Sequence, residues 1–181
     1  SGLQYLHEKN VLHRDIKGGN ILVSDEGIVK LADFGASKSF VTDSNGVLME
    51  GEDSMANMTI RGTPYFMAPE VFQESYGRKA DVWSCACVVY QMCTAHVPWR
   101  SLGIKSPVKL FMHIQNSVGL PPLLNDGSEK DLDIHESLLD LMKQCFERDP
   151  LKRPSVHSLL EHDFFLEHDS CEYSEVGSML G

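Results

Sequence analysis

The sequence predicts an α+β fold that is mainly α-helical and carries one small β-hairpin near its N-terminus. Two short β-prone runs, ILV and IVKLA, flank the turn residues SDEG, so residues 21–31 should form the hairpin. The stretch KADVWSCACVVYQMCTAH, at 79–96, is apolar on nearly every side and should be a helix in the core. Helical spacing of apolar residues recurs at 107–116 and 134–147.

The remaining segments complete a single domain. SGLQYLHEKN, at the start of the chain, should be the last turns of an amphipathic helix. Residues 36–67 are polar without sustained periodicity and should form a long exposed loop. RPSVHSLLEHDFF, at 153–165, should be a helix, and residues 166–181 a polar tail. We therefore expect one domain over 1–165.

Composition and charge exclude several classes of protein. The 181 residues are 42% hydrophobic and 23% charged, which is typical of a soluble globular domain and argues against wholesale disorder. A net charge of -10 without a stripe of Lys and Arg argues against a nucleic-acid partner. No apolar run is long enough to predict a membrane span, and no signal peptide is recognised. A cytoplasmic location is therefore expected.

The cysteines do not indicate a metal site. Their number is odd and they lack CxxC spacing, so they should be free, mostly buried thiols. They are Cys85, Cys87, Cys93, Cys145 and Cys171. The eight histidines are scattered, and neither CxxC nor HExxH spacing offers zinc its tetrahedral ligands.

The predicted hairpin should gather polar side chains at its open end. In an antiparallel hairpin the start of the first strand lies beside the end of the second, so Asn20 and Asp33 should share that end. Asp15 and Lys17 immediately precede it. Two carboxylates and an amide oxygen can hold Mg²⁺ and leave one carboxylate free as a base. Lys17 could then stabilise a phosphoryl group in transit.

The motifs at these positions resemble those of the eukaryotic protein kinase family. The family's H-R-D-x-x-x-x-N, D-F-G and A-P-E motifs are matched by HRDIKGGN at 13–20, DFG at 33–35 and APE at 68–70. The three motifs in this order, with a hairpin and then a long loop between them, are far more specific than any one alone. The resemblance implies phosphoryl transfer from ATP, with Mg²⁺, to a hydroxyl group of a protein.

The resemblance assigns roles to residues of the catalytic loop and hairpin. It makes Asp15 the base that accepts the proton of the substrate hydroxyl, and Lys17 a contact to the transferred phosphoryl group of ATP. Asn20 and Asp33 become the magnesium ligands that also position ATP. Leu22 becomes the floor under the adenine ring, although an ordinary inward-facing strand residue would have the same burial.

Other matches imply structural roles. His13 and Phe34 would pack in the family's internal spine, and Asp81 would hold backbone amides of the catalytic loop. Glu70 should pair with Arg153. The plain alternatives are a helix-terminal acid for Asp81 and a surface ion pair for Glu70.

The resemblance makes residues 33–70 the activation segment. Thr63, in GTPY, would bridge Asp15 and Lys17 through its hydroxyl, and a Lys and a Thr at these two positions accompany transfer to Ser or Thr in the family.

A phosphate switch is also implied. Arg14 and Lys38 would form a pocket for a phosphate on Thr59, the position that matches the family's phosphorylated residue. Ser54 is the second candidate, and the alternative is that Thr59 is only a solvated loop residue.

Within the family, HRDIKGGNIL, DFGASK, GTPYFMAPEV and YGRKADVWS most resemble the MAP kinase kinase kinase branch. That branch implies a signalling cascade in which the protein substrate is a MAP kinase kinase. The Gly-rich loop and strand Lys that bind ATP in the family are not found ahead of His13. The chain is therefore expected to be a C-terminal lobe alone, with the N-lobe as its absent partner, and to be inactive by itself.

Two other functions stay open. One is a binding or scaffold module with a kinase fold and no turnover, which the intact Asp15, Asn20 and Asp33 argue against for the whole protein. The other is a tyrosine kinase, which Lys17 and Thr63 argue against.

Overall fold

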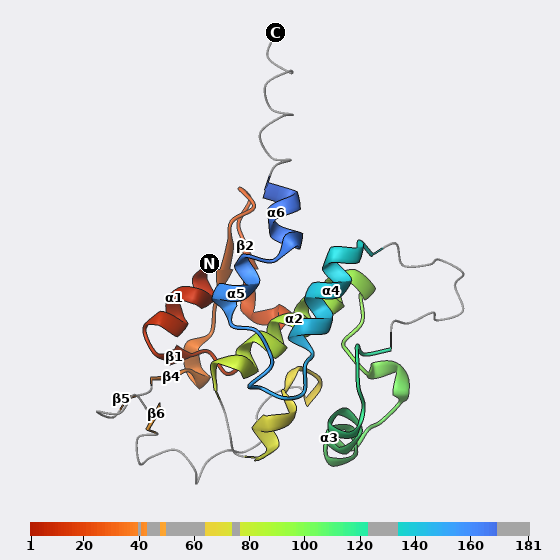
Figure 1. Ribbon diagram of the computed structural model, residues 1–181. Coiled ribbons are helices and arrows are strands. Elements are labelled where there is room, and N and C mark those ends of the chain that lie inside the picture. Colours follow the sequence, from red (N-terminus) through yellow and green to blue (C-terminus); the bar gives the residue numbers. More distant parts are fainter. Residues whose placement is uncertain (40, 43–47, 50–63, 74–76, 123–133, 170–181) are drawn as a thin grey trace.

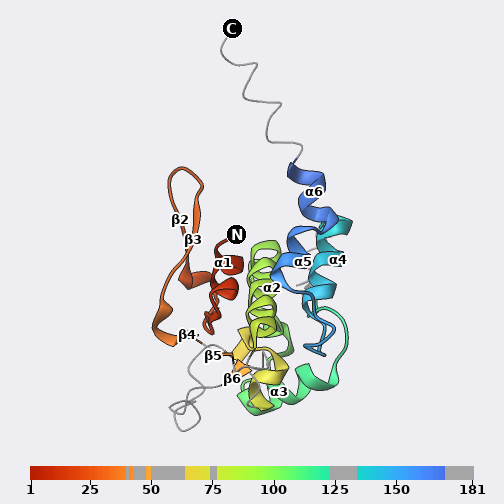
Figure 2. The ribbon, with the colours of Figure 1, turned by 60° about the vertical axis from the view of Figure 1, so that its left-hand side comes forward.

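Helix α2, Arg78–Thr94, runs through the middle of the molecule. In a computed structural model, α1 (Gly2–Glu8) lies on one side of it and α4 (Glu136–Cys145) on the other (Figures 1 and 2). The structure describes residues 1–39, 41–42, 48–49, 64–73, 77–122 and 134–169. The core helix expected at 79–96 is confirmed.

Aromatic side chains surround α2 because its apolar residues face neighbours on several sides. The indole of Trp83 is fully buried and stacks on Trp99, with ring centroids 5.7 Å apart. Phe146 meets Trp83 edge-on at 5.0 Å. Such stacked and edge-on contacts add to the free energy gained by burying the rings, so this cluster fixes α2 in the core.

The C-terminal half of the chain supplies three further helices. Helix α3, Pro107–Asn116, begins after Ser106, whose hydroxyl accepts a hydrogen bond from the Lys109 amide, and it has the predicted bounds. The single helix predicted at 153–165 is wrong. Two short helices are found instead, α5 (Val156–Leu160) and α6 (Asp163–Asp169). The helix breaks because the His162 ring accepts a hydrogen bond from the Phe164 amide and so caps α6.

The described strands form three antiparallel pairs. The predicted hairpin is present as β2 (Ile21–Val23) and β3 (Val29–Leu31), and it extends beside α1 (Figure 2). The other pairs are β1 (Val11–Leu12) with β4 (Lys38–Ser39), and β5 (Val41–Thr42) with β6 (Leu48–Met49). The predicted fold, with one hairpin, therefore lacked the pairs β1–β4 and β5–β6. The sequence did not predict them because two-residue strands are too short to show an alternating pattern.

Short 3₁₀ turns connect these elements. They span Gly18–Asn20, Phe34–Ala36, Pro64–Phe66, Pro69–Gln73 and Arg100–Leu102. Within the described part of the chain, no helix has the length and apolar character needed to cross a membrane.

Four of the cysteines lie on α2 and α4 as free thiols. Burial raises the pKa of Cys85 and of Cys145 to about 12, and raises the pKa of Cys87 and Cys93 as well. The expectation of free thiols holds for these four, and Cys171 lies outside the described residues.

Candidate active site

The carboxylate of Asp15 is held on one side and open on the other. Lys17 Nζ lies 2.6 Å from Asp15 Oδ2, and Asn20 Nδ2 donates to the same oxygen at 3.0 Å. Asn20 Nδ2 also donates to the backbone oxygen of Asp15 at 2.8 Å. Asp15 Oδ1 accepts no hydrogen bond from any described residue, so it can accept one from a substrate.

The hairpin brings Asn20 and Asp33 to the same end. Ile21 pairs with Leu31, and the Ala32 amide donates to the Asn20 carbonyl at 2.8 Å. Asp33 follows directly in a left-handed conformation, with φ at 61°, and its Oδ1 accepts the Gly35 amide at 3.2 Å. The side chain of Asn20 is buried, whereas Asp33 is exposed.

This end of the hairpin suits a hard cation that is shared with phosphate oxygens. Asn20 uses Nδ2 for both of its hydrogen bonds, so its Oδ1 is available to a cation. Among the described residues, no three His, Cys, Asp or Glu side chains lie close enough to hold a metal ion alone. Mg²⁺ commonly takes one or two protein ligands and completes its shell with phosphates and water, which fits Asn20 and Asp33.

His13 ties the catalytic loop to the end of β3. Its ring is fully buried, its Nε2 bonds the Ala32 carbonyl at 3.1 Å, and its Nδ1 accepts the Asp15 amide at 3.4 Å. These two bonds are consistent with a proton on Nε2. The ring centroid of Phe34 lies 5.2 Å from that of His13, although Phe34 is 49% exposed.

Asp81 reaches the catalytic loop from the first turn of α2. Its Oδ1 accepts the Arg14 amide and its Oδ2 the His13 amide, both at 3.0 Å. The carboxylate is fully buried and also bonds His7 Nε2 at 2.9 Å. Sequence reasoning missed His7, although its position four residues after Leu3 places both on the buried face of α1.

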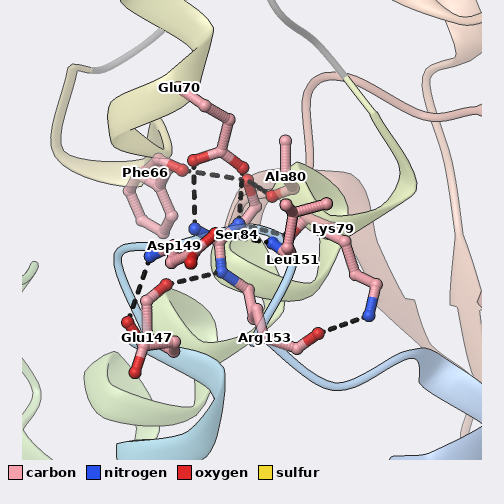
Figure 3. A network of polar contacts seen from close by, with 9 residues as sticks. All are labelled: Phe66, Glu70, Lys79, Ala80, Ser84, Glu147, Asp149, Leu151 and Arg153. Atoms are coloured by element: carbon pink, nitrogen blue, oxygen red, sulfur yellow. Dashed lines mark hydrogen bonds and ion pairs between the residues drawn. The ribbon is translucent and has the colours of Figure 1, made fainter.

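A second buried acid, Glu70, forms a two-point ion pair with Arg153 (Figure 3). The Arg153 guanidinium also donates to the carbonyls of Lys79 and Glu147 at 2.6 and 2.9 Å. It lies 5.1 Å from the centroid of a Trp83 ring. This network joins the turn Pro69–Gln73 to α2 and to the turn before α5.

The structure describes Arg14 and Lys38, the two cations from which a phosphate pocket is expected. Lys38 lies on β4 and pairs with Leu12, and Leu12 is two residues before Arg14 in the sequence. Thr59, Ser54 and Thr63 lie outside the described residues.

Leu22 lies on β2 and exposes 57% of its surface. The plain alternative for Leu22, an ordinary inward-facing strand residue, is therefore wrong. Its contact with an adenine ring stays a prediction.

The family comparison agrees with this arrangement of motifs. A family model described as the protein kinase domain matches residues 1–165. The chain belongs to the protein kinase domain family. The family as a whole uses ATP and Mg²⁺.

Relatives of this kinase domain are named as protein kinases. Mitogen-activated protein kinase kinase kinase A of Dictyostelium discoideum is 39% identical over 93% of the chain. Mitogen-activated protein kinase kinase kinase 19 of Homo sapiens is 39% identical over 90%. Serine/threonine-protein kinase BCK1/SLK1/SSP31 of Saccharomyces cerevisiae is 38% identical over 90%. These names group the kinase domain with the serine/threonine protein kinases.

The chain spans only a small part of these relatives. The aligned regions cover 16%, 11% and 10% of the three proteins, respectively.

The family match corrects the expectation of a C-terminal lobe alone with the N-lobe absent. The match starts at the first residue and extends to residue 165. These residues therefore belong to the protein kinase domain, and the match does not restrict them to its C-terminal lobe. The expectation rested on the Gly-rich loop not being found ahead of His13, and a motif absent from one stretch does not define the rest of a protein. The absent N-lobe partner and the inactivity inferred from it are therefore withdrawn.

Proposed function

We propose that the protein carrying this kinase domain transfers the γ-phosphoryl group of ATP to Ser or Thr residues of a MAP kinase kinase. The observation that carries the proposal is the asymmetric environment of Asp15. Lys17 and Asn20 both engage Oδ2, which leaves Oδ1 to face a substrate hydroxyl. Two relatives are named as mitogen-activated protein kinase kinase kinases, which supports a MAP kinase kinase as the substrate.

In the proposed reaction, Asp15 Oδ1 accepts the hydrogen bond and then the proton of the attacking hydroxyl. The two donors on Oδ2 fix the orientation of the carboxylate, so the base needs little reorganisation when the substrate arrives. The Lys17 ammonium also places positive charge where the phosphoryl group passes to the substrate.

Magnesium-bound ATP supplies the phosphoryl group and has much of its phosphate charge neutralised by the metal. Asn20 Oδ1 and the Asp33 carboxylate would hold the metal at the open end of the hairpin. Leu22 offers the adenine ring an exposed apolar surface on β2.

Regulation of this site would use the activation segment. We propose that Thr63 bridges Asp15 and Lys17, and that a phosphate on Thr59 binds Arg14 and Lys38. Arg14 belongs to the catalytic loop, and Lys38 lies on β4, which pairs with β1 just ahead of that loop; these positions support a link between the phosphate and the base.

Phosphoamino-acid analysis tests the proposed function. The full-length protein, expressed and purified, is incubated with labelled ATP, Mg²⁺ and catalytically inactive MAP kinase kinases. We expect phosphoserine and phosphothreonine on at least one of them. Mainly phosphotyrosine would overturn the specificity, and ATP binding without any transfer would favour the scaffold alternative.

A further inference from the structure

A cavity opens among α1, the first turn of α2 and the start of α5. Helices α1 and α5 lie side by side there (Figures 1 and 2). The cavity has a volume of about 280 Å³, and its lining includes two cations, Arg78 and Lys79, and one carboxylate, Glu8. Asp15 and Lys17 do not line it, so it is separate from the candidate active site.

The two cations use uncharged oxygens as their hydrogen-bond partners. Lys79 Nζ donates to the Arg153 carbonyl (Figure 3), and Arg78 donates to the side-chain oxygen of Asn10. Within the described part of the chain, no carboxylate forms an ion pair with Arg78 or Lys79. A bound anion would therefore interact favourably with two positive charges that no acid already compensates.

The surroundings of Lys79 also favour an anion. Burial lowers the pKa of Lys79, and the positive charge of Arg153 lowers it further. Both effects disfavour the ammonium form, and a negative charge in the cavity would offset both. Glu8 opposes an anion, but its side chain is exposed, so water and salt screen its charge.

The donors around the cavity suit a phosphate group in particular. Arginine offers a planar fork of N–H donors and lysine a compact charge, and both bind phosphate oxygens. The hydroxyl of Ser155 and the ring of His157 also line the cavity and can donate hydrogen bonds. A phosphate monoester brings between one and two negative charges and three strong acceptor oxygens, which matches these donors.

The cavity has room for more than the phosphate. Its volume is near the lower end of the range of about 300–1,000 Å³ that is usual for pockets holding small organic ligands. Val82 and Val156, both buried, form part of its lining. An apolar group attached to the phosphate would lose contact with water against these two side chains, which favours binding.

We infer that this cavity binds a phosphate monoester of a small organic molecule, with Arg78 and Lys79 holding the phosphate and Val82 and Val156 contacting the organic part. The inference does not depend on the proposed function, because neither the base nor the proposed magnesium ligands line the cavity.

The binding test uses phenyl phosphate as the probe and the full-length protein. Its active site is first saturated with Mg²⁺ and a non-hydrolysable ATP analogue, so that the probe cannot bind there. Ligand-observed NMR at constant ionic strength measures Kd for phenyl phosphate, inorganic phosphate and phenol. We expect phenyl phosphate to bind at least about tenfold more tightly than either of the others, since it alone meets both the cations and the valines. No binding of phenyl phosphate below about 10 mM, or a Kd equal to that of inorganic phosphate, would overturn the inference.

Three variants then locate the bound phosphate. Lys79→Met keeps most of the apolar stem and removes the charge, so Kd for phenyl phosphate should rise about tenfold or more. Lys109→Met is the matched control, because Lys109 is an exposed lysine on α3 and does not line the cavity, and its Kd should equal that of wild type. Glu8→Gln removes the opposing charge and should lower Kd about twofold.

Glu8→Gln keeps the test decisive if Lys79→Met does not fold, because an exposed side chain can be changed without loss of the fold. A wild-type Kd in folded Lys79→Met, an equal rise in Lys109→Met, or a Kd that fails to fall in Glu8→Gln would overturn the assignment of the site.

Discussion

Arg153 and Glu70 meet inside the protein through two parallel hydrogen bonds. Arg153 Nη1 lies 2.6 Å from Glu70 Oε1, and Nη2 lies 3.0 Å from Oε2. Their side chains are 0% and 7% exposed. Since each charge is the other's main compensation, removing one leaves the other buried without a partner.

Arg153→Met should therefore destabilise the protein by about 3–5 kcal/mol, as expected when one partner of a buried pair is lost. Urea unfolding followed by circular dichroism measures this free energy. The control is Lys152→Met, since the Lys152 side chain is 74% exposed and its ion pair with Asp149 is 3.9 Å long. That change should cost less than about 1 kcal/mol. Equal losses in the two variants would contradict a stabilising role for the buried pair.

The buried thiols should react slowly in the folded protein. Burial raises the pKa of Cys85 and Cys145 from 9.0 to about 12, so at pH 8 their thiolate fraction is very small. Iodoacetamide labelling read by mass spectrometry should find these two protected until urea unfolds the chain. Cys93 should be labelled before Cys87 and Cys145, because Cys93 is only partly buried whereas the other two are buried. Rapid labelling of Cys85 in the folded state would contradict the expected protection.

The raised pKa values of Cys85 and Cys145 make the free energy of unfolding depend on pH. The folded-state pKa values lie above the unfolded ones, so the folded state binds more protons between about pH 9 and 12. The stabilisation is complete below pH 9 and is lost as pH rises toward 12. Urea midpoints should thus fall between pH 8 and pH 10, and Cys85→Ala should reduce the fall.

Thr59 should carry the activating phosphate. In the full-length protein, Thr59→Ala should lower kcat severely, whereas Ser54→Ala should do less, because only a phosphate at 59 is expected to reach Arg14 and Lys38. Phosphate mapping of the active enzyme, together with activity assays, checks both variants. Full activity in Thr59→Ala with residue 59 unmodified would refute the switch.

Asp33→Asn should impair the use of magnesium. Asn tolerates the left-handed backbone at this position, so the fold should be kept while one negative charge is lost. We expect kcat to fall about a hundredfold and the Mg²⁺ concentration for half-maximal activity to rise. Asp25→Asn, in the exposed turn of the hairpin, is the matched control and should behave as wild type. An unchanged Mg²⁺ requirement in Asp33→Asn would exclude Asp33 as a ligand.

Local patterns in the sequence were enough to predict the elements that position the site. The apolar residues of α2 and the turn residues of the β2–β3 hairpin are contiguous in the chain, so their periodicity could be recognised. The register of that hairpin then followed, and with it the shared end of Asn20 and Asp33.

Long-range contacts and short strands could not be predicted in this way. His7 meets Asp81 across 74 residues, and no local pattern indicates that pairing. The strands that pair Leu12 with Lys38 are only two residues long, so the sequence shows no alternation of polar and apolar residues there. Leu22 follows a strand pattern, yet it is exposed, because alternation predicts which residues share a face and not whether that face is covered.

The most direct test of the central claim, that Asp15 is the base of a protein kinase, is the kcat of Asp15→Asn in the full-length protein. Asn keeps the size of the side chain and a hydrogen-bond acceptor but cannot take the proton at neutral pH. We predict that kcat falls about a thousandfold, within the range known for the loss of a general base, while ATP binding changes less than about twofold and Asp25→Asn stays fully active. A kcat for Asp15→Asn equal to that of wild type would contradict the assignment.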